Sequence, residues 1–336
     1  MNRHCHRRMQ MTAPGPLPPL DAQTRALIEQ MKQGGFKPAH QIPLEVSRAG
    51  LTHMAIAMAA PKVDVYSIED RTIVGPGGGL PIRIYTPGPK LAGEIRATAL
   101  FFHGGGFYLG DLETHDHVCR YLCQQANLIV IAVDYRLAPE NKFPAAPEDC
   151  YTALVWVAGN ARELGIDPSR IALVGDSAGG TLVVSVCLLA RQRGGPGVAY
   201  QVCVYPALTM TDGTEFPSRI ELGSGEYFIS IDDFAFFRGL YLNDPDKEAH
   251  DPLASPIYAD NYRRLPPALV ISAGYDPCRD EDALYAERLE KDGVPVTYRC
   301  FASTIHPFFL FDGAIDAGRE AQQLVADTLS EFLKTK

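Results

Sequence analysis

The alternation of apolar and polar positions separates the chain into a repeating strand and helix pattern and two helical segments. Runs of consecutive apolar residues, typical of strands buried on both faces, are each followed by polar turns or helical spacing. These runs cover residues 98–102, 128–135, 170–176, 200–206, 268–274 and 296–301. Helices are expected between them over 115–126, 146–160 and 178–192. The pattern predicts a mostly parallel sheet flanked by helices.

Three segments depart from this alternation. Residues 20–60 have helical spacing, with Asp21 as a candidate N-cap. The segment after residue 62 alternates with a period of two on both sides of a GPGGG turn, which predicts an antiparallel strand pair. A second helical and proline-rich stretch interrupts the pattern over 207–265. We therefore divide the chain into an N-terminal helical appendage (1–60), a first core part (61–206), an insertion (207–265) and a second core part (266–336).

Composition narrows the possible partners and the compartment. The 336 residues carry 31 basic and 40 acidic side chains, a net charge of −9, which argues against nucleic acid or an anionic membrane surface as the main partner. No apolar run reaches the roughly 18 to 20 residues of a membrane span. The basic N-terminus runs into a proline-rich stretch without the apolar region of a signal peptide. Eight scattered cysteines indicate reduced thiols, so we expect a soluble cytoplasmic protein.

The strongest chemical signal is the segment GDSAGG at residues 175–180, between an apolar strand and an apolar helix. A serine at a tight strand-to-helix turn adopts a strained backbone, and small neighbours avoid clashes with it. Ser177 would then project its hydroxyl above the sheet edge as a nucleophile. The alternative, an ordinary glycine-rich turn of a nucleotide-binding fold, is disfavoured by the motifs that accompany it.

A second glycine-rich motif, HGGGF at residues 103–107, follows the strand 98–102 directly. Glycines allow the backbone to approach a reacting carbonyl and to turn N–H groups toward a developing oxyanion. The amide of Ala178, which follows the nucleophile, supplies a further donor. This pair of motifs predicts acyl-transfer chemistry.

A serine nucleophile requires a base and a carboxylate that orients the base. Where the chain order is serine, acid, histidine, the acid and the histidine both lie on loops after later strands. His306 is the only histidine after residue 250, and it lies in the segment that follows the strand 296–301. Asp276 ends the strand 268–274 and is the expected acid. Its rivals Asp280, Glu281 and Asp282 lie in the expected first turn of the next helix, where acids commonly interact with the helix dipole.

Taken together, these motifs resemble the hormone-sensitive-lipase-like family of α/β-hydrolases, the bacterial esterase group with the GDSAG motif. HGGGF, THDHVCR, VDYRLAPENKFPAAPEDC, GDSAGG, the pair DP at 276–277 and the pair IH at 305–306 stand in the family's order. The resemblance implies Ser177 as nucleophile, Asp276 as acid and His306 as base. It also implies an oxyanion hole of the Gly105, Gly106 and Ala178 amides, and a cap formed by residues 1–60 and 207–265.

Two positions depart from the family pattern. Pro307 stands where the family usually has glycine, which fixes φ and removes an N–H beside the base. Ser303 and Thr304 replace the common Gly-Met pair and add hydroxyls near the base.

Other polar clusters have structural explanations. His115, Asp116 and His117 lack an obvious third metal ligand and are interpreted as a helix N-terminus. Asp134, Arg136 and Glu140 are interpreted as a salt-bridged turn. The cluster His4, Cys5 and His6 is interpreted as part of a disordered tail rather than a metal site.

The sequence therefore predicts an α/β-hydrolase core with a helical cap and a carboxylesterase that hydrolyses short- to medium-chain acyl esters. We expect no cofactor and no metal, a small-molecule ester as the partner, no nucleic acid and no membrane anchor; a homodimer stays open. An amidase or lactonase with the same triad is the nearer alternative. A non-catalytic small-ligand receptor on this fold is the more distant one.

Overall fold

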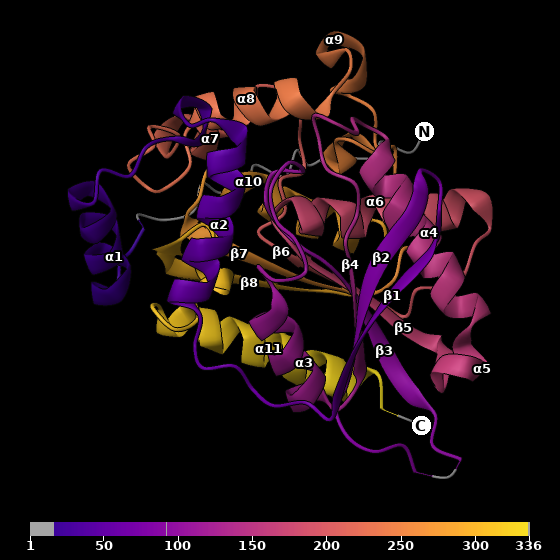
Figure 1. The fold of residues 1–336 in the computed structure, drawn as a ribbon. Coiled ribbons are helices and arrows are strands. Elements are labelled where there is room, and N and C mark those ends of the chain that lie inside the picture. The colour runs from indigo at the N-terminus through magenta and orange to yellow at the C-terminus, as the bar shows by residue number, and fades with distance from the viewer. Residues whose placement is uncertain (1–16, 92, 335–336) are drawn as a thin grey trace, which may run out of the picture.

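A computed structural model describes residues 17–91 and 93–334 and contains one eight-stranded sheet (Figure 1). The strand order is β1-β2-β4-β3-β5-β6-β7-β8. The strands are β1 (Ser67–Gly75), β2 (Gly78–Thr86), β3 (Arg96–Phe102), β4 (Ile129–Val133), β5 (Ile166–Asp176), β6 (Tyr200–Val204), β7 (Ala268–Tyr275) and β8 (Val296–Ile305). Strands β1 and β2 pair antiparallel with each other, and β2 pairs antiparallel with β4. All other neighbours are parallel. The predicted mostly parallel sheet and its antiparallel pair are confirmed.

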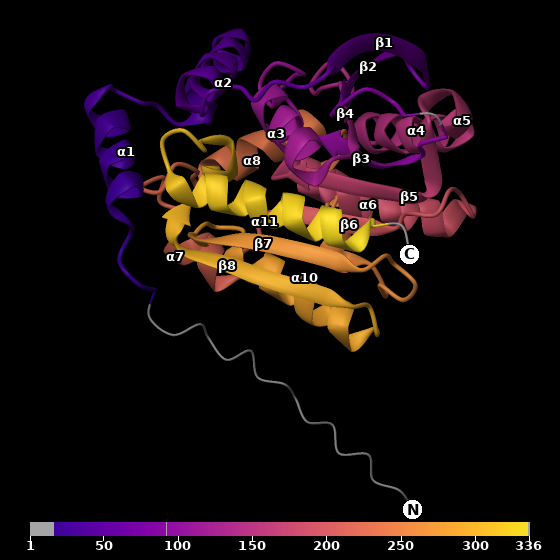
Figure 2. The same cartoon turned by 90° about the horizontal axis from the view of Figure 1, so that it is seen from below.

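Helices cover both faces of the sheet (Figure 2). The α-helices are α1 (Ala22–Gln33), α2 (Leu44–Met58), α3 (Asp116–Ala126), α4 (Ala145–Gly159), α5 (Ala161–Leu164), α6 (Ala178–Arg193), α7 (Pro217–Glu221), α8 (Ile231–Tyr241), α9 (Pro245–Glu248), α10 (Arg279–Lys291) and α11 (Asp316–Phe332). Short 3-10 helices are η1 (Ala39–Gln41), η2 (Pro256–Tyr258) and η3 (Phe308–Leu310). The three predicted core helices appear as α3, α4 and α6, within one residue at each end.

The period of two in the central strands separates two buried cores. In β3, Leu100 packs into a core with residues of α4, α6 and α10, whereas Ala99 and Phe101 face a second core with residues of α3 and α11. Adjacent side chains of a strand point to opposite faces, so one apolar run serves both cores. This explains why the central strands are mostly apolar, with only a few buried polar side chains such as Thr98, Gln201 and Ser272.

The predicted helical appendage is divided into α1, η1 and α2. Asp21 caps α1 as expected, since its Oδ1 accepts the Thr24 N–H at 2.8 Å. In the described part of the chain, residues 17–60 meet the 207–265 insertion where the His40 N–H donates to Asp233 Oδ1 of α8 at 3.1 Å. The two segments that interrupt the core pattern therefore contact each other.

Candidate active site

Ser177 occupies a turn that the local sequence is built to allow. It lies between β5 and α6 with φ of 52° and ψ of −123°, a conformation that non-glycine residues rarely adopt. A Cβ at Gly179 would lie 1.9 Å from the Phe102 carbonyl oxygen, and one at Gly175 would lie 2.4 Å from the Gly179 backbone. Only glycine fits these two approaches. The Ser177 N–H donates to the Val204 carbonyl at 2.8 Å, which fixes the turn on β6.

His306 and Asp276 extend from the ends of neighbouring strands toward Ser177. His306 Nε2 lies 2.9 Å from Ser177 Oγ, and His306 Nδ1 lies 2.8 Å from Asp276 Oδ2. Both side chains are buried. A proton on Nδ1, donated to the carboxylate, leaves the Nε2 lone pair to accept the serine hydroxyl proton. The structure thus brings together the three predicted residues in the order that general-base activation of a hydroxyl requires.

The second oxygen of Asp276 is also held. Its Oδ1 accepts the Cys278 N–H at 2.8 Å. The ring of Tyr205 packs on His306 with centroids 4.3 Å apart. These contacts fix the carboxylate and the imidazole in the orientation in which they meet.

The two departures near His306 have different structural roles. The Thr304 hydroxyl lies 3.0 Å from that of Thr24 in α1, and the Ser303 carbonyl accepts the Asp21 N–H at 2.9 Å. The replaced pair therefore attaches α1 to the strand that ends in the base. Pro307, whose peptide bond with His306 is cis, lines the pocket beside the base.

The HGGGF loop has the backbone conformation that only glycine adopts easily. Gly105 has φ of 120° and Gly106 has φ of 60°. A Cβ on Gly105 would lie 2.3 Å from the Leu109 carbonyl oxygen. Within the described residues, the amides of Gly105, Gly106 and Ala178 donate no hydrogen bond to another protein group. All three residues line the same pocket as Ser177, so their N–H groups remain for a ligand.

Asp176 is a site residue that sequence reasoning missed. It is buried, and its Oδ1 accepts the Gly104 N–H at 2.9 Å and lies 3.0 Å from His115 Nε2. Burial raises the pKa of Asp176, but opposing effects, of which His115 has the largest, hold that pKa below its usual value. The ionised carboxylate connects the residue before the nucleophile to the start of the glycine loop. Its position in GDSAGG, directly before the nucleophile, is the sequence signal that could have found it.

The histidine that opens the glycine loop is neutral. Burial, with a contribution from nearby His115, lowers the pKa of His103 to about 4. Its backbone carbonyl accepts the Tyr135 hydroxyl at 2.7 Å, and Tyr135 stacks on its ring with centroids 4.3 Å apart. His103 therefore packs and holds the loop and does not act as an acid or base near neutral pH.

A pocket with a volume of about 580 Å³ opens above Ser177. Its walls come from the segment containing η1 and α2, from the glycine loop and from the 207–265 insertion. Apolar side chains dominate, including Val46, Leu51, Met54, Met210, Phe228, Phe234 and Phe237. Among the aromatic residues of the insertion, Tyr241 does not line the pocket but stacks on Phe107 at 3.9 Å. The arrangement suits a mainly apolar ligand with one polar reacting group.

The remaining predicted clusters behave as structural groups. Arg136 forms an ion pair with Asp149 at 2.8 Å, and Glu140 forms one with Arg48 of α2 at 2.7 Å. Asp134 is half-buried, and burial raises its pKa to about 6. The predicted turn is salt-bridged, but its partners come from distant helices.

Of the two histidine-containing clusters, residues 115–117 are described by the structure and residues 4–6 are not. His117 lies 3.3 Å from Asp312, and Asp116 lies 2.6 Å from Lys62. The cluster His4, Cys5 and His6 lies outside the described residues.

Potential metal ligands converge at one place in the described chain. The ligand atoms of Asp276, Cys278 and His306 lie within 4.8 Å of one another. Since Asp276 and His306 hydrogen-bond to each other there, we assign this group to the hydrogen-bonded series that begins at Ser177 and not to a metal. No helix among the described residues is long and apolar enough to cross a membrane.

Comparisons with known proteins agree with this geometry. The family described as α/β hydrolase fold matches residues 99–310. Carboxylic ester hydrolase LipN of Mycobacterium tuberculosis is 40% identical over 280 residues, which span 81% of this chain and 73% of that protein. An arylesterase of Saccharolobus solfataricus is 35% identical over 94% of this chain and 100% of its own length. The solved structure of a hyperthermophilic esterase from the archaeon Pyrobaculum calidifontis aligns with a TM-score of 0.88 and 40% identity, covering 94% and 99% of the two chains.

Proposed function

This chain belongs to the α/β-hydrolase family, and from that membership we propose that it is a carboxylesterase whose nucleophile, base and acid are Ser177, His306 and Asp276. The observation that carries the proposal is the continuous hydrogen-bonded chain from Ser177 Oγ through the two imidazole nitrogens to Asp276, with distances of 2.9 and 2.8 Å. The relatives named as esterases support the choice of an ester as substrate.

The first half of the reaction forms an acyl-enzyme. Ser177 Oγ attacks the ester carbonyl carbon while His306 Nε2 takes the hydroxyl proton. The carbonyl oxygen becomes an oxyanion, for which the free amides of Gly105, Gly106 and Ala178 are the proposed donors. The tetrahedral intermediate collapses, the C–O bond to the alcohol breaks, and His306 returns its proton to the departing alkoxide.

The second half repeats these steps with water. His306 removes a proton from water as the water oxygen attacks the acyl carbon, and the Ser177 oxygen leaves with the proton that His306 returns. Asp276 stays ionised and stabilises the imidazolium in both halves. The residues named here account for every proton moved.

We propose short- to medium-chain acyl esters as the substrates. The volume of about 580 Å³ and the apolar side chains above Ser177 support a ligand of modest size. An ethyl acetate hydrolase of Pseudomonas putida, 34% identical over 91% of this chain and 96% of its own length, is named for a small ester.

Residues 1–60 and 207–265 are the proposed cap of this active site. Pocket-lining residues from α2, such as Val46 and Leu51, and from α8, such as Phe234 and Phe237, support this division of the chain. Arg48 of α2 also donates to the carbonyl of Tyr108, the residue after the glycine loop, at 2.9 Å.

The cytoplasm is the proposed location. It rests on the scattered spacing of the cysteines, of which the seven in the described residues are free thiols and six are buried. Sedimentation velocity decides separately whether the protein forms the homodimer that the sequence leaves open.

A panel of p-nitrophenyl esters of increasing acyl length, assayed beside the corresponding anilides and lactones, tests the activity. We expect kcat/KM to be highest for short or medium acyl esters, and much lower for anilides. Preferred turnover of anilides would identify an amidase, and preferred turnover of lactones a lactonase, with the same triad. No turnover of any of them would contradict the proposed function.

A further inference from the structure

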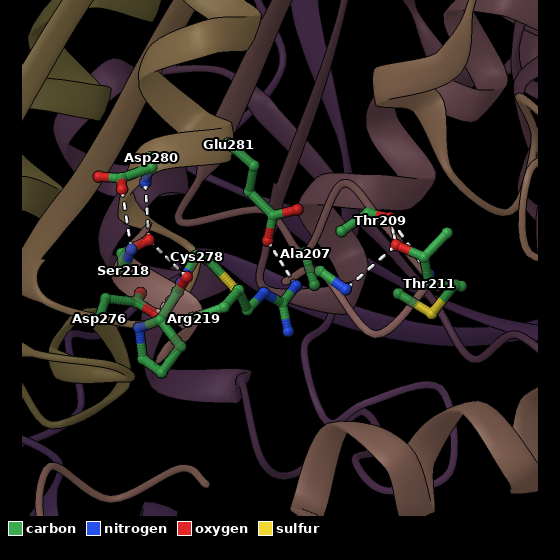
Figure 3. Close-up of polar contacts among 12 residues, drawn as sticks. Ala207, Thr209, Thr211, Ser218, Arg219, Asp276, Cys278, Asp280 and Glu281 are labelled. Carbon is green, nitrogen blue, oxygen red and sulfur yellow. Dashed lines mark hydrogen bonds and ion pairs between the residues drawn. The ribbon is translucent and has the colours of Figure 1, made fainter. Parts of the chain in front are cut away.

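A short helix of the insertion is bound to the loop that carries Asp276 (Figure 3). Ser218 of α7 donates its hydroxyl to the carbonyl of Pro277, the residue after the acid, at 2.8 Å. The Ser218 N–H donates to Asp280 Oδ2 at 2.8 Å, and the Asp280 N–H donates to Ser218 Oγ at 3.2 Å. Two of these hydrogen bonds hold main-chain atoms of the acid loop and the third holds the Asp280 side chain, so Ser218 fixes the loop on the side of Asp276 away from β7.

The next residue of α7 places a positive charge under the same loop. Arg219 is fully buried, and its Nη2 donates to Glu281 Oε1 at 2.6 Å. The guanidinium lies 3.5 Å over the ring of Phe234, which lines the pocket. Among the described residues, Nε and Nη1 of Arg219 have no hydrogen-bond partner. Only one of its donor nitrogens is therefore used by the ion pair, so hydrogen bonding to Glu281 does not fully account for this buried charge.

The loop needs a positive charge because its carboxylates are crowded and buried. Asp276, Asp280, Glu281 and Asp282 all lie within 276–282 and are all buried. Arg279 Nε pairs with Asp280 at 2.9 Å. Burial raises the pKa of Glu281 to about 7, against the opposing effect of Arg219, and burial also raises the pKa of Asp282 well above its usual value. Burial lowers the pKa of Arg219, but Glu281 and other nearby groups, Asp276 among them, outweigh it, so the guanidinium is charged.

Other titratable or charged groups face this cluster from the elements packed around it. They are Cys278 of the acid loop, Cys300 and Tyr298 of β8, Cys203 of β6, His306, Tyr205 after β6, and Glu221 of α7, which lies 4.0 Å from Arg279. None of these is a cation other than His306 itself when protonated. In the described chain, Arg219 is thus the cation that the insertion contributes to the surroundings of Asp276.

We propose that Ser218 and Arg219 are positioning residues for the acid, in which Ser218 fixes the main chain beside Asp276 and the charge of Arg219 keeps Asp276 ionised under His306. The inference rests on the proposed function, because it assigns these residues a role in the same triad. Its consequence is that the insertion supplies part of the support for the catalytic groups as well as part of the pocket wall.

A charge role and a purely structural role predict different pH profiles. A nearby cation favours the carboxylate form of Asp276 and disfavours the imidazolium form of His306. Removing the cation disfavours the carboxylate and favours the imidazolium, so the acidic limb of kcat/KM moves to higher pH. Removing Glu281 breaks the same ion pair but keeps the cation, so that limb does not move upward. If the ion pair had a purely structural role, removing Arg219 or Glu281 would change the pH profile of kcat/KM in the same way.

The experiment measures kcat and kcat/KM of the full chain with a p-nitrophenyl ester from pH 5 to 9. For Arg219→Met we expect the acidic limb of kcat/KM to lie about one pH unit higher, which is the size of a single charge effect at short range in a protein. For Glu281→Gln and Arg219→Lys we expect no upward movement. For Ser218→Ala we expect kcat to fall about tenfold with the limb unchanged, because misplacing a catalytic group lowers the rate without changing its charge.

The double variant Arg219→Met/Glu281→Gln protects the test against misfolding. It leaves neither partner of the ion pair buried alone, and such replacements are generally tolerated. Compared with Glu281→Gln, from which it differs at one position, its limb should lie about one pH unit higher. Equal limbs in this comparison would overturn the charge role, and an unchanged kcat in Ser218→Ala would overturn the backbone role. Loss of the proposed function is recognised separately, because the parent itself would then fail to hydrolyse the ester or Ser177→Ala would retain its activity.

Discussion

The turn that carries Ser177 and the loop that carries Asp276 hold two members of one triad by different means. The serine turn is fixed by backbone contacts: Gly179 approaches the Phe102 carbonyl so closely that no Cβ fits, and the Ser177 N–H bonds to β6. The acid loop is fixed by side chains, among them Ser218 and Arg219, from a helix about 60 residues earlier in the chain.

The difference has consequences for how each part can fail. A turn built from backbone approaches depends on a few glycines and is encoded in a short motif. A loop supported by buried charges depends on a balance among several distant groups, so a substitution there changes protonation as well as position. Variants in the serine turn should therefore change backbone position, whereas variants in the acid loop should also change the pH dependence of activity or stability.

The largest effect is expected at the serine itself. Ser177→Ala removes the nucleophile but no packing contact of consequence, so kcat should fall by at least about 10⁴-fold while the melting temperature stays near that of the parent. Ester turnover and thermal unfolding measure the two quantities. Activity within tenfold of the parent would remove Ser177 from the mechanism.

The acid should give the next largest effect. Asp276→Asn no longer favours the imidazolium or the required tautomer of His306, and kcat should fall by about 10³- to 10⁴-fold. Asp280→Asn is the matched control. Its carboxylate binds Ser218 and Arg279 instead of the histidine, so we expect a loss of less than about tenfold. Reversed effects would move the acid to Asp280.

The glycine turn should respond through its backbone. In Gly179→Ala the new Cβ would lie 1.9 Å from the Phe102 carbonyl oxygen, and relieving that clash should lower the free energy of unfolding by about 1 to 3 kcal/mol and displace Ser177. Denaturant unfolding and ester turnover both report the change. Gly159→Ala, where a Cβ would meet nothing within 4 Å, should preserve both, and equal behaviour of the two variants would contradict the close approach.

The smallest effect is a pH-dependent gain of stability in the acid loop. Asp282 is buried, neither of its oxygens has a partner among the described residues, and burial holds its pKa well above the usual value. The folded protein then keeps this carboxyl protonated while the unfolded chain ionises it, so stability is lost as the pH rises above about 4. Asp282→Asn should melt a few degrees higher than the parent at pH 8 and nearly equal to it at pH 4. A lower melting temperature at pH 8 would show that Asp282 is ionised and stabilising.

The same difference explains what could be predicted from the sequence. The sheet, the core helices and the positions of Ser177, Asp276 and His306 follow from local apolar runs and from strand ends, which the chain order determines. The sequence predicts Asp280, Glu281 and Asp282 in the first turn of the next helix, where they do lie, but it does not show that all three are buried. Nothing near Ser218 or Arg219 in the sequence shows that this short helix packs against the acid loop.

Covalent trapping of the nucleophile tests the central claim most directly. A p-nitrophenyl phosphonate ester reacts with an activated serine by forming an O–P bond and releasing p-nitrophenolate, and the adduct persists because its phosphorus centre resists hydrolysis. We predict one phosphonyl group per chain, located by peptide mass spectrometry on Ser177, with loss of ester turnover in proportion to labelling and no label in Ser177→Ala. A parent that hydrolyses esters but carries the label on another residue, or none at all, would contradict the account.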